Sequence, residues 1–437
     1  MRLQALCAVA LTIAAGLASG QQPVYLDAAQ PLEKRVEDLI GRLTLDEKAS
    51  LMGTTAPAIE RLKVPIMNAW NQSLHGIVWT RPTTMFPVNI SMAATWNPAL
   101  VEQVASVIAD EGRAIYNLVP TVPAASYDKD NRGQLITITA TGERLRHNGL
   151  VYRSPVINIS RDPRWGRIHE AFGEDPHLTS RIGVAYVKGT QGNDPKYLKL
   201  AATLKHYAVN NQESNRFALN VNVSERMLHE FWLPHFKAAV VEGKAQSIMS
   251  VYNSVNGVPG SANKYLVTDI LRGMWKFDGF VVPDSTAVSR AIPGHGLASS
   301  IEEAAAKSVL AGHDLDNVDF APNIARAVAK GYMTEKDVDQ AVRRVLRVRF
   351  RLGEFDPPEM VPYSRISPSI ICSPAHRDLS LRMARESLVL LTNRDNFLPL
   401  DRAKVKTIAV IGPHADRAMT GIGYTGLSAK FIKPLDG

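Results

Sequence analysis

The hydrophobic positions of the chain fall into two alternating kinds of segment between about residue 60 and residue 320. Short apolar runs rich in β-branched residues occur at 151–159, 199–204, 247–252 and 279–282. Longer segments with apolar residues at helical spacing follow them, for example at 224–242 and 301–311. This alternation predicts βα units that build a parallel sheet. The length of the region favours an α/β fold of the TIM type, a (β/α)8 barrel.

The pattern changes near residue 356, where a stretch rich in Pro and Ser predicts a linker up to residue 374. A helical segment at 376–393 and an apolar run at 406–413 follow, and the run predicts a buried strand. We therefore expect a barrel at 21–358, a linker and helix at 359–400, and at 401–437 the truncated start of a C-terminal α/β sandwich domain. The segment at 118–149 fits neither pattern.

The first twenty residues have the pattern of a signal peptide. Arg2 precedes a short apolar stretch at 6–17, and Ala18-Ser19-Gly20 supplies small residues at the expected cleavage point. We expect residues 1–20 to be removed and the mature protein to be secreted or periplasmic. No apolar run, including the one at 6–17, reaches the roughly 20 residues that a membrane span needs, so no membrane association is expected after removal. Only Cys372 then remains, which excludes an intramolecular disulfide.

The formal net charge of +8 raises the question of an acidic partner such as a nucleic acid. The densest cluster of arginines lies at 343–351, with apolar residues at helical spacing between them. This pattern is typical of an amphipathic helix with a solvated basic face. We therefore expect no nucleic-acid partner.

Candidate chemistry lies directly after the predicted strands, because active sites of parallel barrels form at the carboxyl ends of the strands. The residues at these positions are Asp284, Lys205 with His206, Tyr252, and Arg161. A carboxylate held ionised by nearby cations can attack an anomeric carbon, and the cations can donate hydrogen bonds to sugar hydroxyls. A buried cation at a strand end is equally often part of a structural ion pair.

Several ordered motifs resemble glycoside hydrolase family 3, the family of β-glucosidases, β-xylosidases and related exo-acting enzymes. The strongest motif is SPVINISRDPRWGR at 154–167, and others are LHG at 74–76, KHYA at 205–208 and VYNSVNG at 251–257. The resemblance implies a retaining mechanism in which Asp284 is the nucleophile. It also implies that Arg161, Lys205, His206 and Tyr252 line the subsite of the sugar that is cleaved. The expected partner is a small carbohydrate.

Three positions depart from the family pattern. Gln72 stands where a Glu is common, and Pro283 stands where Ser usually precedes the nucleophile. We expect Gln72 to contact the sugar without carrying charge, and Pro283 to disturb the placement of Asp284. In related two-domain enzymes the acid/base Glu lies in the second domain, and no residue of this chain matches it.

Two functions remain open at this point. One is an exo-acting β-glycosidase for terminal β-D-glucosyl or β-D-xylosyl residues, and the other is a catalytically impaired sugar-binding remnant of such an enzyme. The choice between glucose and xylose depends on contacts that the sequence does not reveal. We find neither the paired-His helix motif of zinc hydrolases nor a Gly-rich phosphate loop, so no metal or cofactor is expected. The oligomeric state is not predicted.

Overall fold

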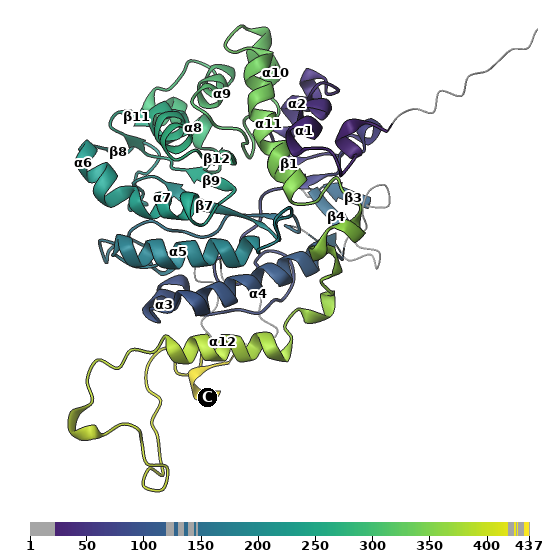
Figure 1. Cartoon of the computed structure of the whole chain (residues 1–437). Coiled ribbons are helices and arrows are strands. Elements are labelled where there is room, and N and C mark those ends of the chain that lie inside the picture. The colour runs from purple at the N-terminus through teal and green to yellow at the C-terminus, as the bar shows by residue number, and fades with distance from the viewer. Residues whose placement is uncertain are drawn as a thin grey trace, which may run out of the picture.

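The computed structural model describes residues 22–118, 126–129, 135–138, 144–145, 147–417, 424, 426 and 432–436 (Figure 1). The expected signal peptide at 1–20 lies outside these residues. The helices are α1 (Leu32–Ile40), α2 (Leu45–Leu51), α3 (Asn89–Ala94), α4 (Pro98–Tyr116), α5 (Pro176–Gln191), α6 (Glu225–Met227), α7 (Pro234–Val241), α8 (Ala287–His295), α9 (Ile301–Leu310), α10 (Ile324–Ala329), α11 (Glu335–Arg351) and α12 (Pro374–Glu386). The strands are β1 (Thr55–Ala56), β2 (Met67–Asn68), β3 (Ser126–Lys129), β4 (Leu135–Ile138), β5 (Arg144–Leu145), β6 (Val151–Tyr152), β7 (Ala201–Tyr207), β8 (Asn220–Val221), β9 (Ser247–Ser250), β10 (Ser254–Val255), β11 (Val258–Pro259) and β12 (Phe280–Pro283).

The central sheet has four parallel strands in the order β12-β9-β7-β6. All seven residues of β7 are buried, as expected for a parallel strand covered on both faces. Parallel order requires crossover segments, and helices such as α5 between β6 and β7 supply them. The sequence therefore predicted the parallel α/β character of this region correctly.

Helices α4 and α5 lie side by side on one flank of the sheet, and α12 lies along α4 (Figure 1). The close approach of α5 to α4 depends on Gly189, because a Cβ atom there would lie 2.2 Å from the carbonyl oxygen of Glu102. On the other flank α11 packs against α1 and β12. These helices bury one continuous apolar core, which includes Leu204, Ile248 and Val281 of the strands.

An eight-stranded parallel barrel is not confirmed by the described residues. Beyond the four strands, backbone contacts continue at both edges: the N–H of Asp314 donates to Val281 at 2.8 Å, Gly53 bridges Asp316, and Asn71 bridges Tyr152. Strands β1 and β2 pair antiparallel. Residues 57–66 between them are too few for the helical crossover of about a dozen residues that a parallel pair needs.

Other predicted elements agree with the structure in type but differ at their ends. The helix expected at 224–242 consists of α6, a π-helical stretch at Leu228–Trp232 and α7, while α9 is close to its predicted bounds. The unassigned region at 118–149 contains β3, β4 and β5, which form an antiparallel sheet. The rest of that region is mostly outside the described residues.

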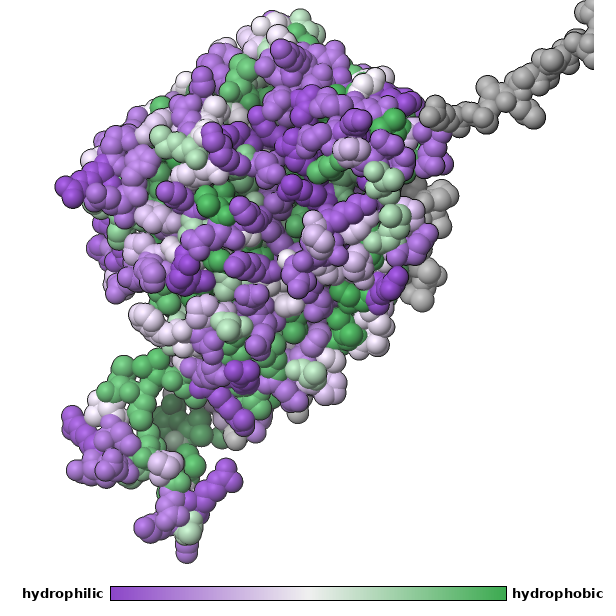
Figure 2. Space-filling view, in the orientation of Figure 1, coloured by the Kyte–Doolittle hydropathy of each residue, from purple (hydrophilic) through white to green (hydrophobic). Residues whose placement is uncertain are grey.

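Two predictions are wrong: the solvated basic face of the helix at 343–351, and the buried strand at 406–413. Helix α11 forms, but Arg343 and Arg347 pair with Glu37 and Glu33 of α1 and do not form a freely solvated face. Residues 406–413 form no strand, and the side chain surface of Ile411 is 90% exposed. The segment after α12 is extended and carries hydrophobic residues on its surface (Figure 2). No helix within the described ranges is long and apolar enough to cross a membrane.

Candidate active site

Asp284 lies directly after β12, at the carboxyl end of the central sheet. Its backbone N–H donates to the carbonyl of Ser250 on β9 at 3.2 Å, and its carboxylate Oδ1 accepts from the N–H of Ser285 at 2.7 Å. Helix α8 begins three residues later, so the positive end of its dipole lies near the carboxylate. The side chain is 14% exposed and is therefore accessible to a small ligand.

Pro283 does not interrupt the strand pairing that positions Asp284. The N–H groups of a strand alternate between its two neighbours, and Val281 donates to Asp314 at 2.8 Å while Asp284 donates to Ser250. The missing N–H of Pro283 therefore falls on the side away from β9. The β12–β9 ladder continues to Ser250 opposite Pro283.

Lys205 and Gln72 meet beside this strand end, although they lie far apart in sequence. The Nζ of Lys205, on β7, donates to Oε1 of Gln72 at 2.9 Å, and both residues are buried. Burial lowers the pKa of Lys205 to about 7, a shift that the charge of Arg167 reinforces and the charges of Glu170 and Asp284 oppose. A glutamate at position 72 would oppose it further, so the uncharged Gln72 leaves Lys205 poised to titrate near neutral pH.

His206 faces Asp284 as a neutral imidazole. Burial and the charges of Arg167 and Lys205 hold its pKa well below the usual range. Its Nδ1 lies 3.1 Å from Oδ1 of Asn158, which can only accept, so Nδ1 carries the proton. Nε2 then accepts from Nη1 of Arg167 at 3.3 Å and lies 3.6 Å from Oδ2 of Asp284, beyond a hydrogen bond. His206 therefore does not neutralise the carboxylate.

Tyr252 follows β9, the strand that lies between β12, which precedes Asp284, and β7, which carries Lys205. Its hydroxyl donates to the carbonyl of Ser285 at 2.7 Å, and burial together with the charge of Asp284 raises its pKa. The ring packs edge-on against Phe217, and the guanidinium of Arg216 lies 4.6 Å from its centroid. These contacts hold Tyr252 as a rigid wall beside the carboxylate.

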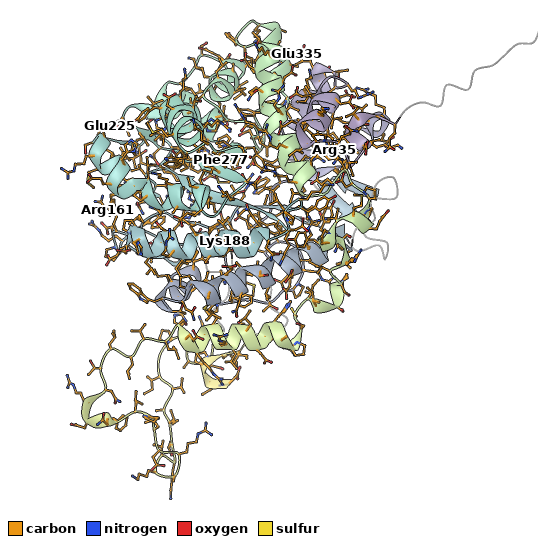
Figure 3. All side chains as sticks on the ribbon, in the orientation of Figure 1. Arg35, Arg161, Lys188, Glu225, Phe277 and Glu335 are labelled. Atoms are coloured by element: carbon orange, nitrogen blue, oxygen red, sulfur yellow. The ribbon has the colours of Figure 1, made fainter. Side chains whose placement is uncertain are left out.

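Arg161, expected in the subsite, lies elsewhere in the structure. Its guanidinium stands 5.6 Å from the ring of Trp232, and the residue is exposed at the edge of the molecule (Figure 3). Arg167 from the same motif points inward instead, where it binds Glu170 through two hydrogen bonds of 2.9 and 2.7 Å. The sequence therefore identified the motif at 154–167, but it did not indicate that Arg167 is the arginine that contacts His206.

Arg153 is a second buried cation near Asp284 that sequence reasoning missed. It follows β6, and its guanidinium lies 5.2 Å from the ring of Trp70. Burial lowers its pKa to about 10, and the charge of Asp284 opposes this shift. Its position directly after an apolar strand was the available signal, since the same argument singled out Lys205.

Tyr424 brings the C-terminal segment to the same site. Its ring centroid lies 4.8 Å from Nζ of Lys205 and 5.4 Å from that of Trp79. The nearby Gly426 is close to the backbone of Ile77, because a Cβ there would lie 2.5 Å from its carbonyl oxygen. Burial raises the pKa of Tyr424, and the charge of Arg167 opposes this shift. The site is thus built from residues that precede α12 and from the segment that follows it.

The other carboxylates near the site are already engaged. Burial would raise the pKa of Glu170, but the hydrogen bonds from Arg167 outweigh it and hold the pKa below the usual range. Glu213 accepts from Trp165 at 3.0 Å and from Arg216 at 2.5 Å. Asp162 binds Arg164, which lowers its pKa. Each of these three carboxylates is therefore held by hydrogen bonds from other side chains.

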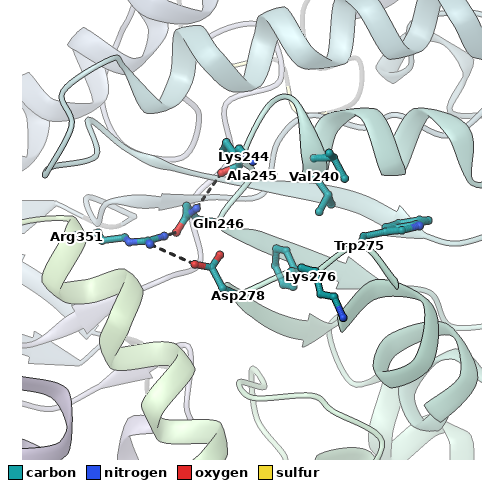
Figure 4. A pocket seen from close by; sticks show the side chains of 10 residues that line it. Val240, Lys244, Ala245, Gln246, Trp275, Lys276, Asp278 and Arg351 are labelled. Carbon is teal, nitrogen blue, oxygen red and sulfur yellow. Dashed lines mark hydrogen bonds and ion pairs between the residues drawn. The ribbon is translucent and has the colours of Figure 1, made fainter. Parts of the chain in front are cut away.

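No group of three or more His, Cys, Asp or Glu side chains in the described part of the chain is arranged to hold a metal ion. A hollow lined by Val240, Lys244, Gln246, Trp275, Lys276 and Arg351 lies at the opposite ends of the strands (Figure 4). There Arg351 donates to Gln246 at 2.7 Å and pairs with Asp278 at 3.2 Å. Gln246 directly precedes β9, and Asp278 lies just before β12, whereas Asp284 follows β12, so the hollow is separate from Asp284.

Comparison with known proteins identifies the family of this chain. The N-terminal domain of glycosyl hydrolase family 3 matches residues 44–134 and 134–348, and the C-terminal domain of that family matches residues 388–437. The chain belongs to glycoside hydrolase family 3. The resemblance noted in the sequence is therefore confirmed, and a segment of the C-terminal domain is present.

The chain is also similar to individual family members. It is 37% identical to beta-D-xylosidase 1 of Arabidopsis thaliana, over 94% of this chain and 52% of the relative. It is 38% identical to a xylan 1,4-beta-xylosidase of Xylanibacter ruminicola, over 100% of this chain and 49% of the relative. The chain thus spans about half the length of these curated relatives.

Two solved structures are similar in fold. An exo-beta-xylosidase of this family (XlnD), in complex with a xylobiose aziridine probe, has a TM-score of 0.84 and 31% identity, and the match covers 95% of this chain and 52% of that one. Beta-glucosidase 3B from Thermotoga neapolitana has a TM-score of 0.72 and 26% identity, with 92% and 53% covered. Both xylosidases and glucosidases therefore share this architecture.

Proposed function

We propose that this protein is an exo-acting, retaining β-glycosidase with Asp284 as its nucleophile. The observation that carries the proposal is the setting of Asp284: a partly exposed carboxylate at a strand end, near two buried cations, Lys205 and Arg153. Neighbouring cations favour the ionised form that attacks. The neutral His206 leaves Oδ2 without a hydrogen bond from its ring.

In this mechanism Asp284 Oδ2 forms a bond to the anomeric carbon as the bond to the leaving oxygen breaks. The leaving oxygen takes a proton from a general acid. Water then attacks the anomeric carbon of the glycosyl-enzyme, loses a proton to the conjugate base, and regenerates the free carboxylate. The engaged state of Glu170 and Glu213 supports our expectation that the acid does not come from these residues.

We propose a terminal β-D-xylosyl or β-D-glucosyl residue as the sugar that is released. The names of the similar proteins, which include xylosidases and glucosidases, support this range. We propose that four residues contact this sugar: Lys205, Gln72, His206 and Tyr252. We add Arg153 and Arg167 to these sugar-binding residues. Arg153 is buried near Asp284, and Arg167 contacts His206.

We further propose that the backbone contacts at both edges of the central sheet belong to a barrel. They lead from β12 through Asp316 and Gly53 to Asn71 and back to β6. The proposed export through a signal peptide at 1–20 is supported by its sequence pattern alone. N-terminal sequencing of the secreted protein would test it, and a start other than near Gln21 would contradict it.

A 2-fluoro glycoside with a good leaving group tests the nucleophile, because it traps the covalent intermediate. We expect peptide mass analysis of the full protein to locate the label on Asp284, with both xylosyl and glucosyl reagents compared. Asp284→Ala should abolish turnover and labelling while leaving the thermal unfolding temperature nearly unchanged. A label on Glu170 or Asp162 would contradict the assignment. Tight sugar binding without turnover or labelling would instead favour a sugar-binding protein.

A further inference from the structure

The side chain of Arg153 is held from the opposite edge of the central sheet. Arg153 follows β6, the last strand in the order β12-β9-β7-β6. Its Nη2 donates to Oδ1 of Asn317, which lies beyond the other edge, three residues after the Asp314 N–H that binds β12. This hydrogen bond joins residues 164 positions apart in sequence. It therefore links the two edges of the sheet, at the end where Arg153 and Asp284 follow their strands.

Few other contacts orient this guanidinium. Arg153 is 2% exposed, and its ring contact is Trp70, whose centroid lies 5.2 Å away. In the described part of the chain, the bond to Asn317 is the only hydrogen bond that its side chain makes, and its Nε is buried without a partner. Arg113, by contrast, donates to three backbone carbonyls. The direction of the Arg153 guanidinium thus depends largely on one amide oxygen.

Asp316, the neighbour of Asn317, adds a buried carboxylate to the same place. Its Oδ1 accepts from the N–H groups of Val318 and Asp319, whereas its Oδ2 is buried and accepts from none of the described groups. The charges of Asp316 and Arg153 act on each other. A buried carboxylate with an unpaired oxygen is costly, and such groups are retained mainly where a site uses them.

We propose that Asn317 and Asp316 are positioning residues for Arg153. Asn317 orients the guanidinium through the direct hydrogen bond, and the ionised Asp316 supplies the counter-charge that keeps it in its buried seat. This inference rests on the proposed function, in which Arg153 contacts the sugar. A small displacement of a binding group lowers both affinity and rate, so residues that touch no sugar still decide how well the site works.

The contribution of Asp316 depends on pH. Burial and the charge of Asp319 raise the pKa of Asp316 to about 6, and the charge of Arg153 opposes this shift. The neighbouring segment contributes the uncharged Thr54, and α8 contributes the N–H of Ser289, which binds Asp319 at 3.0 Å. As the pH falls through about 6, the carboxylate takes up a proton and Arg153 loses this counter-charge. Sugar affinity should fall with it.

A double-mutant cycle tests Asn317, with D-xylose and D-glucose as probes in calorimetric titrations of the full protein. We expect Asn317→Leu to weaken sugar binding roughly tenfold, because a hydrogen bond to a charged group is lost. Asn317→Asp keeps an oxygen acceptor and should recover most of this loss. In the Arg153→Met background, Asn317→Leu should have no further effect, because Asn317 acts through Arg153.

Asn117→Leu is the matched control. The side chain of Asn117 donates to the carbonyls of Tyr363, Ser364 and Ile366, so this variant loses stability but should leave sugar affinity unchanged. Parent-like affinity in Asn317→Leu would overturn the role of Asn317. Equal losses with and without Arg153 would also overturn it, since Asn317 would then act independently of the guanidinium.

The Nε resonance of Arg153 in nitrogen NMR tests Asp316 without any sugar, and its loss in Arg153→Met assigns it. Its chemical shift should change near pH 6 in the parent and should not in Asp316→Asn. Asp319→Asn should move the change to lower pH, because a charge that raises the pKa of Asp316 is removed. A change that persists in Asp316→Asn would overturn the role of Asp316. If Asp316→Asn unfolds, the direction of the shift in Asp319→Asn decides.

These measurements separate the proposal from the proposed function. Arg153 signals that respond as expected, in a protein that binds neither sugar, would support the positioning residues and count against the glycosidase. Sugar binding and labelling of Asp284 that are unaffected by Asn317→Leu and Asp316→Asn would keep the glycosidase and overturn the positioning. Lys205, with a pKa of about 7, titrates in the parent and in the variants alike, so only the difference between them reports on Asp316.

Discussion

Burial shifts the pKa values of individual ionisable residues near the end of the sheet. Lys205 loses hydration on β7, and its pKa falls to about 7. Asp316 is completely buried, and burial together with the charge of Asp319 raises its pKa to about 6. Burial disfavours the charged form of each group, so each group lowers the free energy of unfolding when it is charged. For Lys205 this cost applies at neutral and lower pH, and for Asp316 it applies at higher pH.

Lys205 should make stability rise with pH between about 7 and its unfolded value near 10.4. In that interval the unfolded state binds the proton and the folded state does not, so the free energy of unfolding increases with pH. Lys205→Met should remove this contribution and flatten the slope. Urea unfolding at several pH values measures the effect, with Lys276→Met as the control. An unchanged slope in Lys205→Met would show that Lys205 stays protonated.

Arg167 should be needed to keep Glu170 buried. The pair has side-chain exposures of 13% and 3%, and removing one partner of a buried pair typically costs about 3–5 kcal/mol. We therefore expect Arg167→Met to lower the free energy of unfolding by about this amount. Arg167→Met combined with Glu170→Gln should recover part of the loss. A single variant as stable as the parent would show that water or another group compensates Glu170.

At the scale of elements, α12 is attached to the rest of the fold by a buried carboxylate of α4. Glu111 accepts from the N–H and hydroxyl of Thr84 at 2.8 and 2.6 Å. It also accepts from the N–H of Cys372 at 3.0 Å and lies 2.8 Å from Nδ1 of His376 on α12. One side chain therefore connects α4, the loop before α3 and the start of α12.

Loss of this carboxylate should loosen α12. Burial would raise the pKa of Glu111, but the hydrogen bonds from His376 and Thr84 hold it below the usual range. Its contribution to stability is thus present above the unfolded value of about 4.3 and is lost as the pH falls through the folded pKa. Glu111→Ala should speed hydrogen exchange in Pro374–Glu386 at pH 7, with α5 as the internal reference. Unchanged exchange in α12 would show that its apolar contacts suffice.

At the scale of the whole molecule, charge and hydrophobicity are unevenly distributed. Much of the basic charge in α11 is used in ion pairs with α1 and with the buried Asp314. The segment after α12, in contrast, exposes Leu388, Leu391 and Ile411 by 80%, 90% and 90%. Apolar residues gathered on a surface favour association or coverage by another segment.

This apolar segment should make the 437-residue chain self-associate. Light scattering and binding of a hydrophobic dye should both exceed those of a variant with Leu391→Lys and Ile411→Lys. Lysines at these exposed positions should leave the unfolding temperature of the rest of the chain nearly unchanged. A parent chain that stays monomeric without binding the dye would show that the segment is covered.

The family, the parallel α/β character and the residues at the strand ends could be predicted from the amino-acid sequence alone. Asp284, Lys205, His206 and Tyr252 could be predicted to gather because parallel strands bring their carboxyl ends to one edge. Gln72 came from its motif, and the structure places it 2.9 Å from Lys205. Periodicity sufficed for these features because it depends on local backbone geometry and on which positions face the core.

Which charged side chains meet depends on the three-dimensional packing of the chain. It turned Arg167 inward and left Arg161 on the surface, and it brought Arg153 and Tyr424 to Asp284's surroundings. It also paired β1 with β2 antiparallel and left the apolar run at 406–413 without a strand partner. These outcomes depend on side-chain direction, connection length and contacts between segments far apart in sequence, none of which a one-dimensional pattern of apolar and polar positions encodes.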